Sequence, residues 1–277
     1  MPTLAQRLPY LHPFAGGYPY RGSQRLPSDP DALAYLAAVA AADGAPVETA
    51  VAVAVDDFFR GTKADGTFGA LKASCILCGA RTLAGALVPL AGDAPTNNNF
   101  VDADYNRETG LVGNGSSKYL NSNRTCDADG EDDRHWAFFS TTALSNIDCC
   151  FGADIAGTFS NTQVRVNTEN FLFCASPDST GASAALFANS GAQGFHGASR
   201  DNSASFVARS AGSAITKTVS SAVPPGDDLF FFARNTSTGA SNHASTRLAF
   251  YSIGEALDLE ALDARVSALV TSIGAAI

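Results

Sequence analysis

Charged side chains are scarce in this sequence. They make up 16% of the 277 residues, against roughly 25% in an average globular domain. The 27 acidic residues outnumber the 18 Lys and Arg, so the net charge is −9. An acidic chain has no long-range field that would draw it onto nucleic acid or an anionic membrane. These two classes of partner are therefore disfavoured.

Cysteine and long apolar runs are also sparse. There are six cysteines, and Cys149 and Cys150 are adjacent, which the geometry of ordinary disulfides disfavours. We therefore expect mostly reduced thiols. The longest apolar stretch, around residues 47–55, is shorter than the roughly 20 residues of a membrane span. The first residues lack the apolar run of an export signal, so no export and no membrane insertion are predicted.

Residues 1–27 mix proline and glycine with aromatic side chains and show no helical or strand period. Such a segment cannot form a core of its own, yet it is too aromatic for a solvated linker. We interpret it as an anchoring arm. It lies either on its own domain or on another chain, and its anchoring side chains are Tyr10, Phe14, Tyr18 and Tyr20.

Residues 28–92 are predicted to form a small, Ala-rich helical unit. The first helix begins near Ser28, a good N-cap, and ends at Gly44. The second is expected from 46 to 61, where a glycine ends it, although its alternating valines also fit a buried strand. A third is expected over 67–77.

Residues 93–253 change to short β-rich runs separated by Gly, Ser, Asn and Pro. This rhythm is typical of a β-sandwich or jelly roll. Residues 254–277 then repeat apolar side chains every three or four positions, with Asp258 near the start, which predicts an amphipathic helix. The predicted strands are 135–140, 171–175, 185–188, 205–209, 215–219, 229–234 and 247–253.

Motifs for metal or catalysis are weak. Cys75 and Cys78 have the spacing of half a zinc site, but no second pair follows, so they are interpreted as buried small hydrophobes. The acidic run 127–133 resembles the front of a calcium loop, yet Phe138 stands where the closing Glu would be. A solvated turn is the favoured interpretation there, and calcium binding stays open. No catalytic residues, metal ligands or cofactors are predicted.

Planar polar and aromatic side chains in loop-like settings suggest a sugar site instead. A pyranose needs an apolar ring against its C–H face and fixed polar groups for its hydroxyls. Trp136 also fits a core anchor within its strand. The candidate glycan-binding residues are Tyr105, Asn106, Arg107, Tyr119, Arg124, Trp136 and His196.

Several phrases together resemble a recurrent module of tailed-phage and gene-transfer-type particles. They include YNRETGLVGNG at 105–115 and FYSIGE at 250–255, and the similarity covers roughly residues 50–277. The resemblance implies a concanavalin A-like, lectin-type jelly roll preceded by a short helical lead-in and followed by a helix. It further implies a spike or fibre on the virion surface, made in the bacterial cytoplasm and often trimeric.

The sequence therefore predicts a mainly β protein that acts as a non-enzymatic virion head or tail fibre. It would bind host cell-surface polysaccharide and attach through its arm to other virion structural proteins, as a homotrimer. Two alternatives stay open: a structural capsid decoration protein without glycan binding, and a polysaccharide depolymerase.

Overall fold

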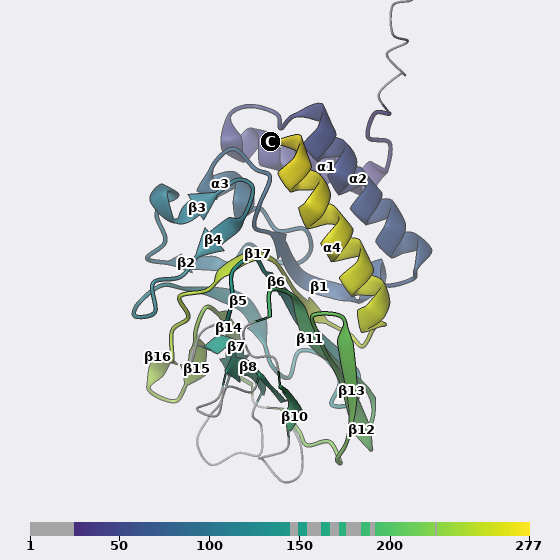
Figure 1. Cartoon of the computed structure of the whole chain (residues 1–277), viewed down its shortest axis with the longest axis vertical. Coiled ribbons are helices and arrows are strands. Elements are labelled where there is room, and N and C mark those ends of the chain that lie inside the picture. The colour runs from purple at the N-terminus through teal and green to yellow at the C-terminus, as the bar shows by residue number, and fades with distance from the viewer. Residues whose placement is uncertain are drawn as a thin grey trace, which may run out of the picture.

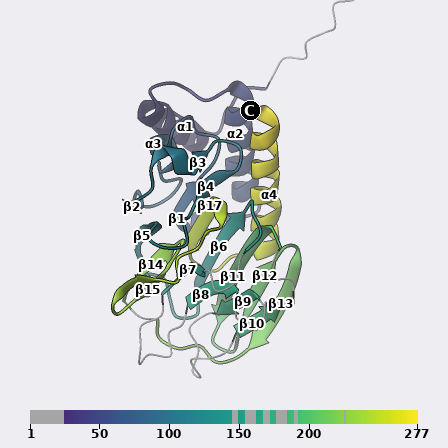
Figure 2. The same cartoon turned by 60° about the vertical axis from the view of Figure 1, so that its left-hand side comes forward.

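A computed structural model describes residues 25–144, 149–153, 162–166, 172–175, 184–188, 192–224 and 226–277. Two antiparallel sheets lie face to face, and a layer of helices packs on the outside of one of them (Figures 1 and 2). The fold class predicted from the sequence, a mainly β sandwich with helices near both ends of the chain, is confirmed. The anchoring residues Tyr10, Phe14, Tyr18 and Tyr20 lie outside the described residues.

The covered sheet lies between the helices and the second sheet. Its strand order is β13-β12-β11-β6-β17-β4-β3, and β1 pairs with β17 on the same edge as β4, further along the strand. Its strands are β1 (Leu71–Ile76), β3 (Tyr105–Asn106), β4 (Gly110–Val112), β6 (Arg134–Ser140), β11 (Gly194–Asn202), β12 (Ser205–Ser210), β13 (Ser213–Thr218) and β17 (Arg247–Gly254).

The outer sheet has the order β10-β9-β8-β7-β14-β5-β2, with the β15–β16 hairpin attached to β7. Its strands are β2 (Thr96–Asn98), β5 (Tyr119–Thr125), β7 (Cys149–Ala153), β8 (Thr162–Val166), β9 (Leu172–Ala175), β10 (Ala184–Phe187), β14 (Asp228–Phe231), β15 (Arg234–Thr236) and β16 (Gly239–Ser241).

The helical layer combines the two ends of the described chain. Asp29 caps α1 through its carboxylate, and Asp258 caps α4 in the same way. The predicted terminal helix is α4, and it packs within its own chain, against α2 and β11. The helices are α1 (Pro30–Asp43), α2 (Thr49–Ala64), α3 (Leu83–Ala86), α4 (Leu259–Ala276) and the 3-10 turns η1 (Phe68–Ala70) and η2 (Asp102–Asp104).

Two apolar cores follow from this layering. Side chains such as Trp136, Phe138 and Tyr251 pack between the two sheets. Neighbouring residues on the same strands, such as Ala137 and Phe250, point the other way and pack under the helices. The covered sheet is therefore buried on both faces, because side chains alternate along a strand.

The helix predicted over residues 67–77 is wrong. Only a 3-10 turn forms there, and residues 71–76 form β1, which pairs along β17. Leu71 and Ile76 face the helices while Ala73 and Cys75 face the other sheet. Pairing within a sheet that is buried on both faces overrides the local helical pattern.

The end predicted for the second helix at Gly61 is also wrong, because α2 continues to Ala64. A Cβ at position 61 would lie 2.7 Å from Cδ of Arg265, whose guanidinium pairs with Asp65. This glycine provides room for a side chain of α4. The expected unit of residues 28–92 is likewise joined to the sandwich, since β1 belongs to the covered sheet.

We predict that Leu262→Ala lowers the free energy of unfolding by about 3 kcal/mol, because the side chain is fully buried under the helical layer. Leu33→Ala on α1, where the residue is 48% exposed, is the control and is expected to cost less than about 0.5 kcal/mol. Urea unfolding of both variants measures the difference. Equal losses would contradict the packing of α4 on the sheet.

Candidate functional site

An aromatic strip lies on the face of the outer sheet that points away from the core. The Tyr119 and Phe230 rings are 4.7 Å apart between centroids, and Tyr119 and His243 are 6.0 Å apart. Tyr119 therefore stands in the middle of the strip. None of the three packs in either apolar core cluster, but Phe230 is only 8% exposed, so Tyr119 and His243 present most of the accessible ring surface.

Strand alternation places the first two rings on this face. On β5, Leu120 enters the core between the sheets, so Tyr119 and Asn121 point outward. On the paired strand β14, Phe231 enters the core, so Phe230 points outward directly beside Asn121. Figures 1 and 2 show the long helices α1, α2 and α4 on the other side of the molecule, over the covered sheet.

Amide and carboxylate groups border the aromatic strip. Asn121 donates from Nδ2 to Oδ2 of Asp228 at 2.7 Å, and Asn235 donates to the backbone oxygen of Asp228 at 2.8 Å. These hydrogen bonds hold the polar groups in set orientations. We call Tyr119, Phe230, His243, Asn121 and Asp228 the platform.

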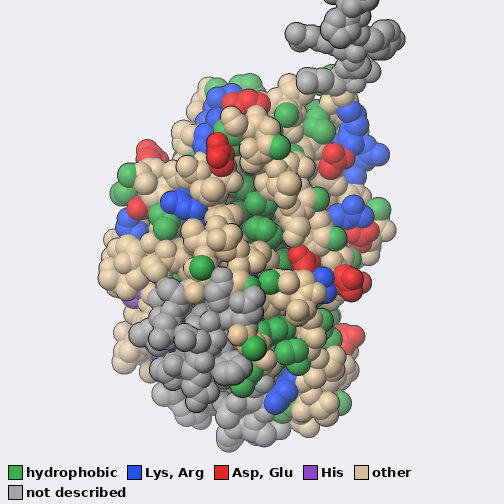
Figure 3. All heavy atoms as spheres, viewed as in Figure 1, with side chains coloured by type: hydrophobic (Ala, Val, Ile, Leu, Met, Phe, Trp, Pro, Cys, Tyr) green, Lys and Arg blue, Asp and Glu red, His purple; other side chains and the backbone are tan. Residues whose placement is uncertain are grey.

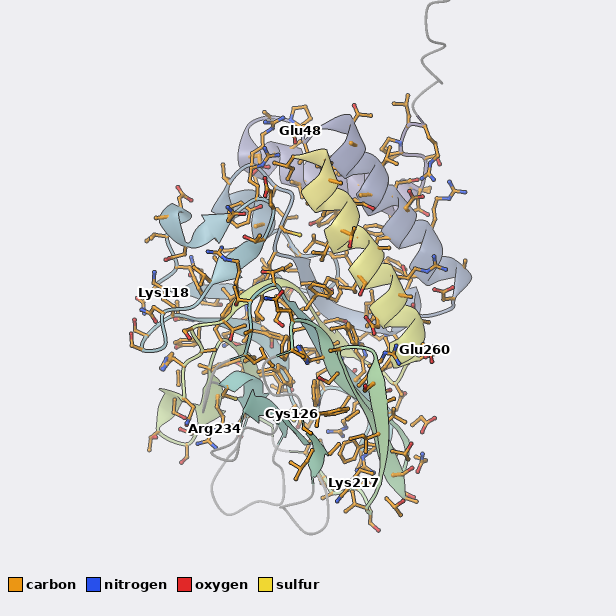
Figure 4. All side chains as sticks on the ribbon, in the orientation of Figure 1. Glu48, Lys118, Cys126, Lys217, Arg234 and Glu260 are labelled. Atoms are coloured by element: carbon orange, nitrogen blue, oxygen red, sulfur yellow. The ribbon has the colours of Figure 1, made fainter. Side chains whose placement is uncertain are left out.

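The platform carries one formal charge at neutral pH. Partial burial lowers the pKa of His243 below its usual 6.5, so the ring is neutral at pH 7. Lys118, at the start of β5, is paired with Asp104. The Tyr119 hydroxyl has no hydrogen-bond partner within the described part of the chain. Figure 4 places Lys118 and Arg234 on the side of the molecule where β15 and β16 lie, far from Glu260 of α4.

This arrangement suits a polar ligand with one apolar face. Aromatic rings cover C–H surface, while amide and carboxylate groups accept and donate hydrogen bonds at fixed positions. A sugar ring combines both kinds of surface. The platform can therefore stack a sugar on Tyr119 and hold its hydroxyls with Asn121 and Asp228.

The structure does not bring the predicted glycan-binding residues together. Tyr105 donates to the backbone oxygen of Ala80 at 2.8 Å, and Arg107 donates to the same oxygen and pairs with Glu48. Asn106 accepts three hydrogen bonds from residues 108 and 109 and shapes its own turn. Tyr105 and Arg107 thus tie the end of β3 to residue 80 and to the start of α2, and Asn106 stabilises the turn that follows β3.

Of the other four predicted residues, only Tyr119 belongs to the platform. Arg124 pairs with Asp129. Trp136 is 2% exposed and packs against Phe151, so it is the core anchor that the sequence also allowed. His196 is fully buried between Ser140 and Ser210. Burial keeps Trp136 and His196 out of reach of a surface ligand.

The motifs considered for metal binding have structural partners. Cys75 and Cys78 are buried, and burial raises the pKa of each thiol to about 12, so both behave as small hydrophobes. In the acidic run, Asp133 accepts from the backbone of Ala256. No group of three or more potential metal ligands occurs among the described residues. Over the same residues, no helix has the length and apolar character needed to cross a bilayer.

A concavity lies away from the platform, between strands β11 to β13 and the start of α4. Its volume is about 490 Å³, and its lining includes Ser199, Asp201, Val207, Arg209 and Glu260. Arg209 donates to the carboxylate of Asp263 at 2.7 Å, so its charge is already neutralised. None of the predicted glycan-binding residues lines this cleft.

No protein-family model matches the chain, and no curated protein matches it. Among solved structures, the NanB sialidase of Streptococcus pneumoniae is similar at 12% identity over 56% of this chain and 27% of its own, with a TM-score of 0.40. A GH54 arabinofuranosidase follows at 14% over 59% and 41%, with a TM-score of 0.38. A leech intramolecular trans-sialidase matches at 11% over 65% and 27%, with a TM-score of 0.35.

The chain spans less than half the length of each of these three proteins. The three are named as a sialidase, an arabinofuranosidase and a trans-sialidase, and this finding contradicts the predicted function of a non-enzymatic virion fibre that binds host polysaccharide. The phage-module resemblance, the virion-surface location, the partner proteins and the homotrimer stay predictions.

The sequence pointed to Tyr119, with Asn121 beside it, but gave no indication of Phe230, Asp228 or His243 as ligand-binding residues. Phe230 lies in a run of four residues, Leu229 to Phe232, that is apolar throughout, so nothing local marks which ring points outward. His243 has no recognisable motif around it. A usable signal was the alternation in β5, where Tyr119 and Asn121 flank the buried Leu120.

The buried histidines predict a pH dependence of stability. Burial lowers the pKa of His135 and of His196 to about 4, below the unfolded value of about 6.5. The unfolded chain therefore binds more protons between these values, and stability is full above pH 6.5 and falls toward pH 4.

The expected loss is on the order of 3 kcal/mol for each histidine. Urea unfolding at steps from pH 7 to pH 4 measures it. His196→Asn is expected to halve the slope over this window, while the exposed-site variant Leu33→Ala keeps the full slope. An unchanged slope in His196→Asn would show that its neutral burial does not control acid stability.

Proposed function

We propose that this protein recognises carbohydrate, with the platform on the outer sheet as the contact surface. The observation that carries the proposal is the placement of Tyr119 between Phe230 and His243, beside the hydrogen-bonded pair of Asn121 and Asp228. Rings for the C–H face of a sugar and fixed polar groups for its hydroxyls stand on one surface.

The charge of the platform selects the class of carbohydrate. Asp228 is the only acidic side chain of the platform, and partial burial lowers the pKa of its one imidazole, His243, which disfavours a positive charge there. A negatively charged sugar would meet a like charge there, which lowers affinity. The platform therefore favours neutral oligosaccharides over acidic ones.

A second candidate function is glycoside hydrolysis at the same surface. Asp228 favours it, since its carboxylate lies within the platform and its Oδ2 accepts from Asn121. Glycosidases act with a pair of carboxyl groups beside the bound sugar. Asp228 would be one of this pair, as acid, base or nucleophile.

We predict that Tyr119→Ala weakens binding of a neutral oligosaccharide by about tenfold or more, because the central stacking surface is lost. Tyr119→Phe keeps the ring and is expected to stay within about threefold of the native chain, since a single hydroxyl contributes little. Calorimetry or retention on immobilised glycans, with a panel of neutral and acidic polysaccharides, measures both. Equal binding by the native chain and Tyr119→Ala would move recognition away from the platform.

The same panel separates binding from hydrolysis. Incubation of each glycan with the native chain, followed by a reducing-end assay, tests for cleavage. If Asp228→Asn no longer sets reducing ends free but is still retained on the glycan, hydrolysis is assigned to this surface. Retention without release would leave recognition as the function. Absence of both, with a folded protein by circular dichroism, would overturn the proposal.

A further inference from the structure

A groove runs along the outer surface between α2 and α4. The two helices are antiparallel neighbours, since Gly61 near the end of α2 meets Arg265 near the start of α4. At the other end, a cavity of about 390 Å³ opens between the start of α2 and the end of α4. Its lining is Arg25, Thr49, Ala50, Val53, Ser272, Ala275 and Ala276.

A second, smaller cavity continues this groove along the same two helices. Its volume is about 150 Å³, and it shares Ser272 with the first. The side chains between them are small, as at Ala54 and Ala268. In Figure 3 the surface over the C-terminal half of α4 is mostly uncharged, and charged side chains border it over α2. The groove is thus a narrow, mainly apolar channel with a polar edge.

The described chain begins at the rim of the groove and is firmly attached there. Arg25 pairs with the carboxylates of Asp56 and Asp57. Asp56 is fully buried and accepts from the backbone N–H groups of Ser28 at 2.7 Å and Asp29 at 2.6 Å. Because these contacts hold residues 25–29 on α2, the preceding 24 residues start beside the larger cavity.

The composition of residues 1–24 matches this groove. The segment has four aromatic side chains and four prolines, and prolines favour an extended backbone over a helix. It holds two arginines and no acidic residue, while the rest of the chain holds 27 acidic residues against 16 basic ones. The sign of its charge and its aromatic content both favour binding of the segment to its own domain.

The segment before Arg25 is also long enough to reach along the groove. Seven extended residues span roughly 23 Å, and the 18 residues of α4 extend about 27 Å. Tyr18 and Tyr20 can therefore reach most of the groove from Arg25. A tyrosine suits a cavity with an apolar wall and a polar rim, because its ring is apolar and its hydroxyl is not.

We propose that the N-terminal segment, residues 1–24, binds in the groove between α2 and α4 of its own chain, with Tyr18 or Tyr20 in the larger cavity. The segment then acts as a strap that ties the start of the chain to its last helix. The strap covers apolar surface of the helical layer and leaves the platform on the opposite sheet free.

The test is site-specific photocrosslinking in the full chain. A benzoylphenylalanine at position 20, followed by mass spectrometry of the digested protein, is expected to map crosslinks to residues 49–53 and 272–276 within a single chain. The yield is expected to be independent of protein concentration. Crosslinks to other surfaces, or none above the level of the same photoreactive residue at exposed position 101, would overturn the proposal.

A matched pair of variants on α4 checks that the groove itself is the binding site. Ala275→Trp fills the larger cavity and is expected to lower the crosslink yield by about tenfold. Ala264→Trp makes the same change at an exposed position of the same helix outside both cavities, and the yield is expected to stay unchanged. A covalent dimer that rises with concentration would show that a neighbouring copy supplies the segment, which also overturns binding within one chain.

Discussion

Burial of the covered sheet on both faces is the constraint on which the rest of the structure depends. One face packs on the outer sheet and the other on α2 and α4, so every polar group on its strands needs a partner inside the protein. His135 meets this need with Ser252 and the backbone of residue 255, at 2.7 Å and 2.6 Å. His196 meets it with two serines. The neutral state of both rings and the acid sensitivity of the fold follow from the same burial.

The same constraint decides where a ligand can bind. A sheet covered on both sides offers a surface ligand only its edges, whereas none of the helices that the structure describes lies over the far face of the outer sheet (Figure 2). Outward residues of β5 and β14 are therefore available for recognition, and the hydrogen bonds of Asn121 and Asn235 to Asp228 hold that surface in shape. The helical layer packs on the covered sheet, whereas the platform lies on the outer sheet. Substitutions at the platform therefore leave the helical layer intact.

The helical layer also explains how the two ends of the chain are brought together. α4 packs on α2, and the first described residue, Arg25, is held on α2 by Asp56 and Asp57. Residues 1–24 are cationic and rich in aromatic side chains, whereas the rest of the chain is acidic. The groove that we propose for them lies next to Arg25.

The sequence by itself determined the class of fold and much of its local structure. Capping by Asp258, the stop at Gly44 and strands such as β6 and β17 follow from neighbouring residues, and local patterns predicted them. Tertiary structure alone decided that residues 71–76 form a strand, because their pairing partner β17 lies about 180 positions away. It also decided that Trp136 and His196 are buried while Tyr119 is not. Chemical type marks a residue as able to bind sugar, but only packing determines which face of a sheet reaches solvent.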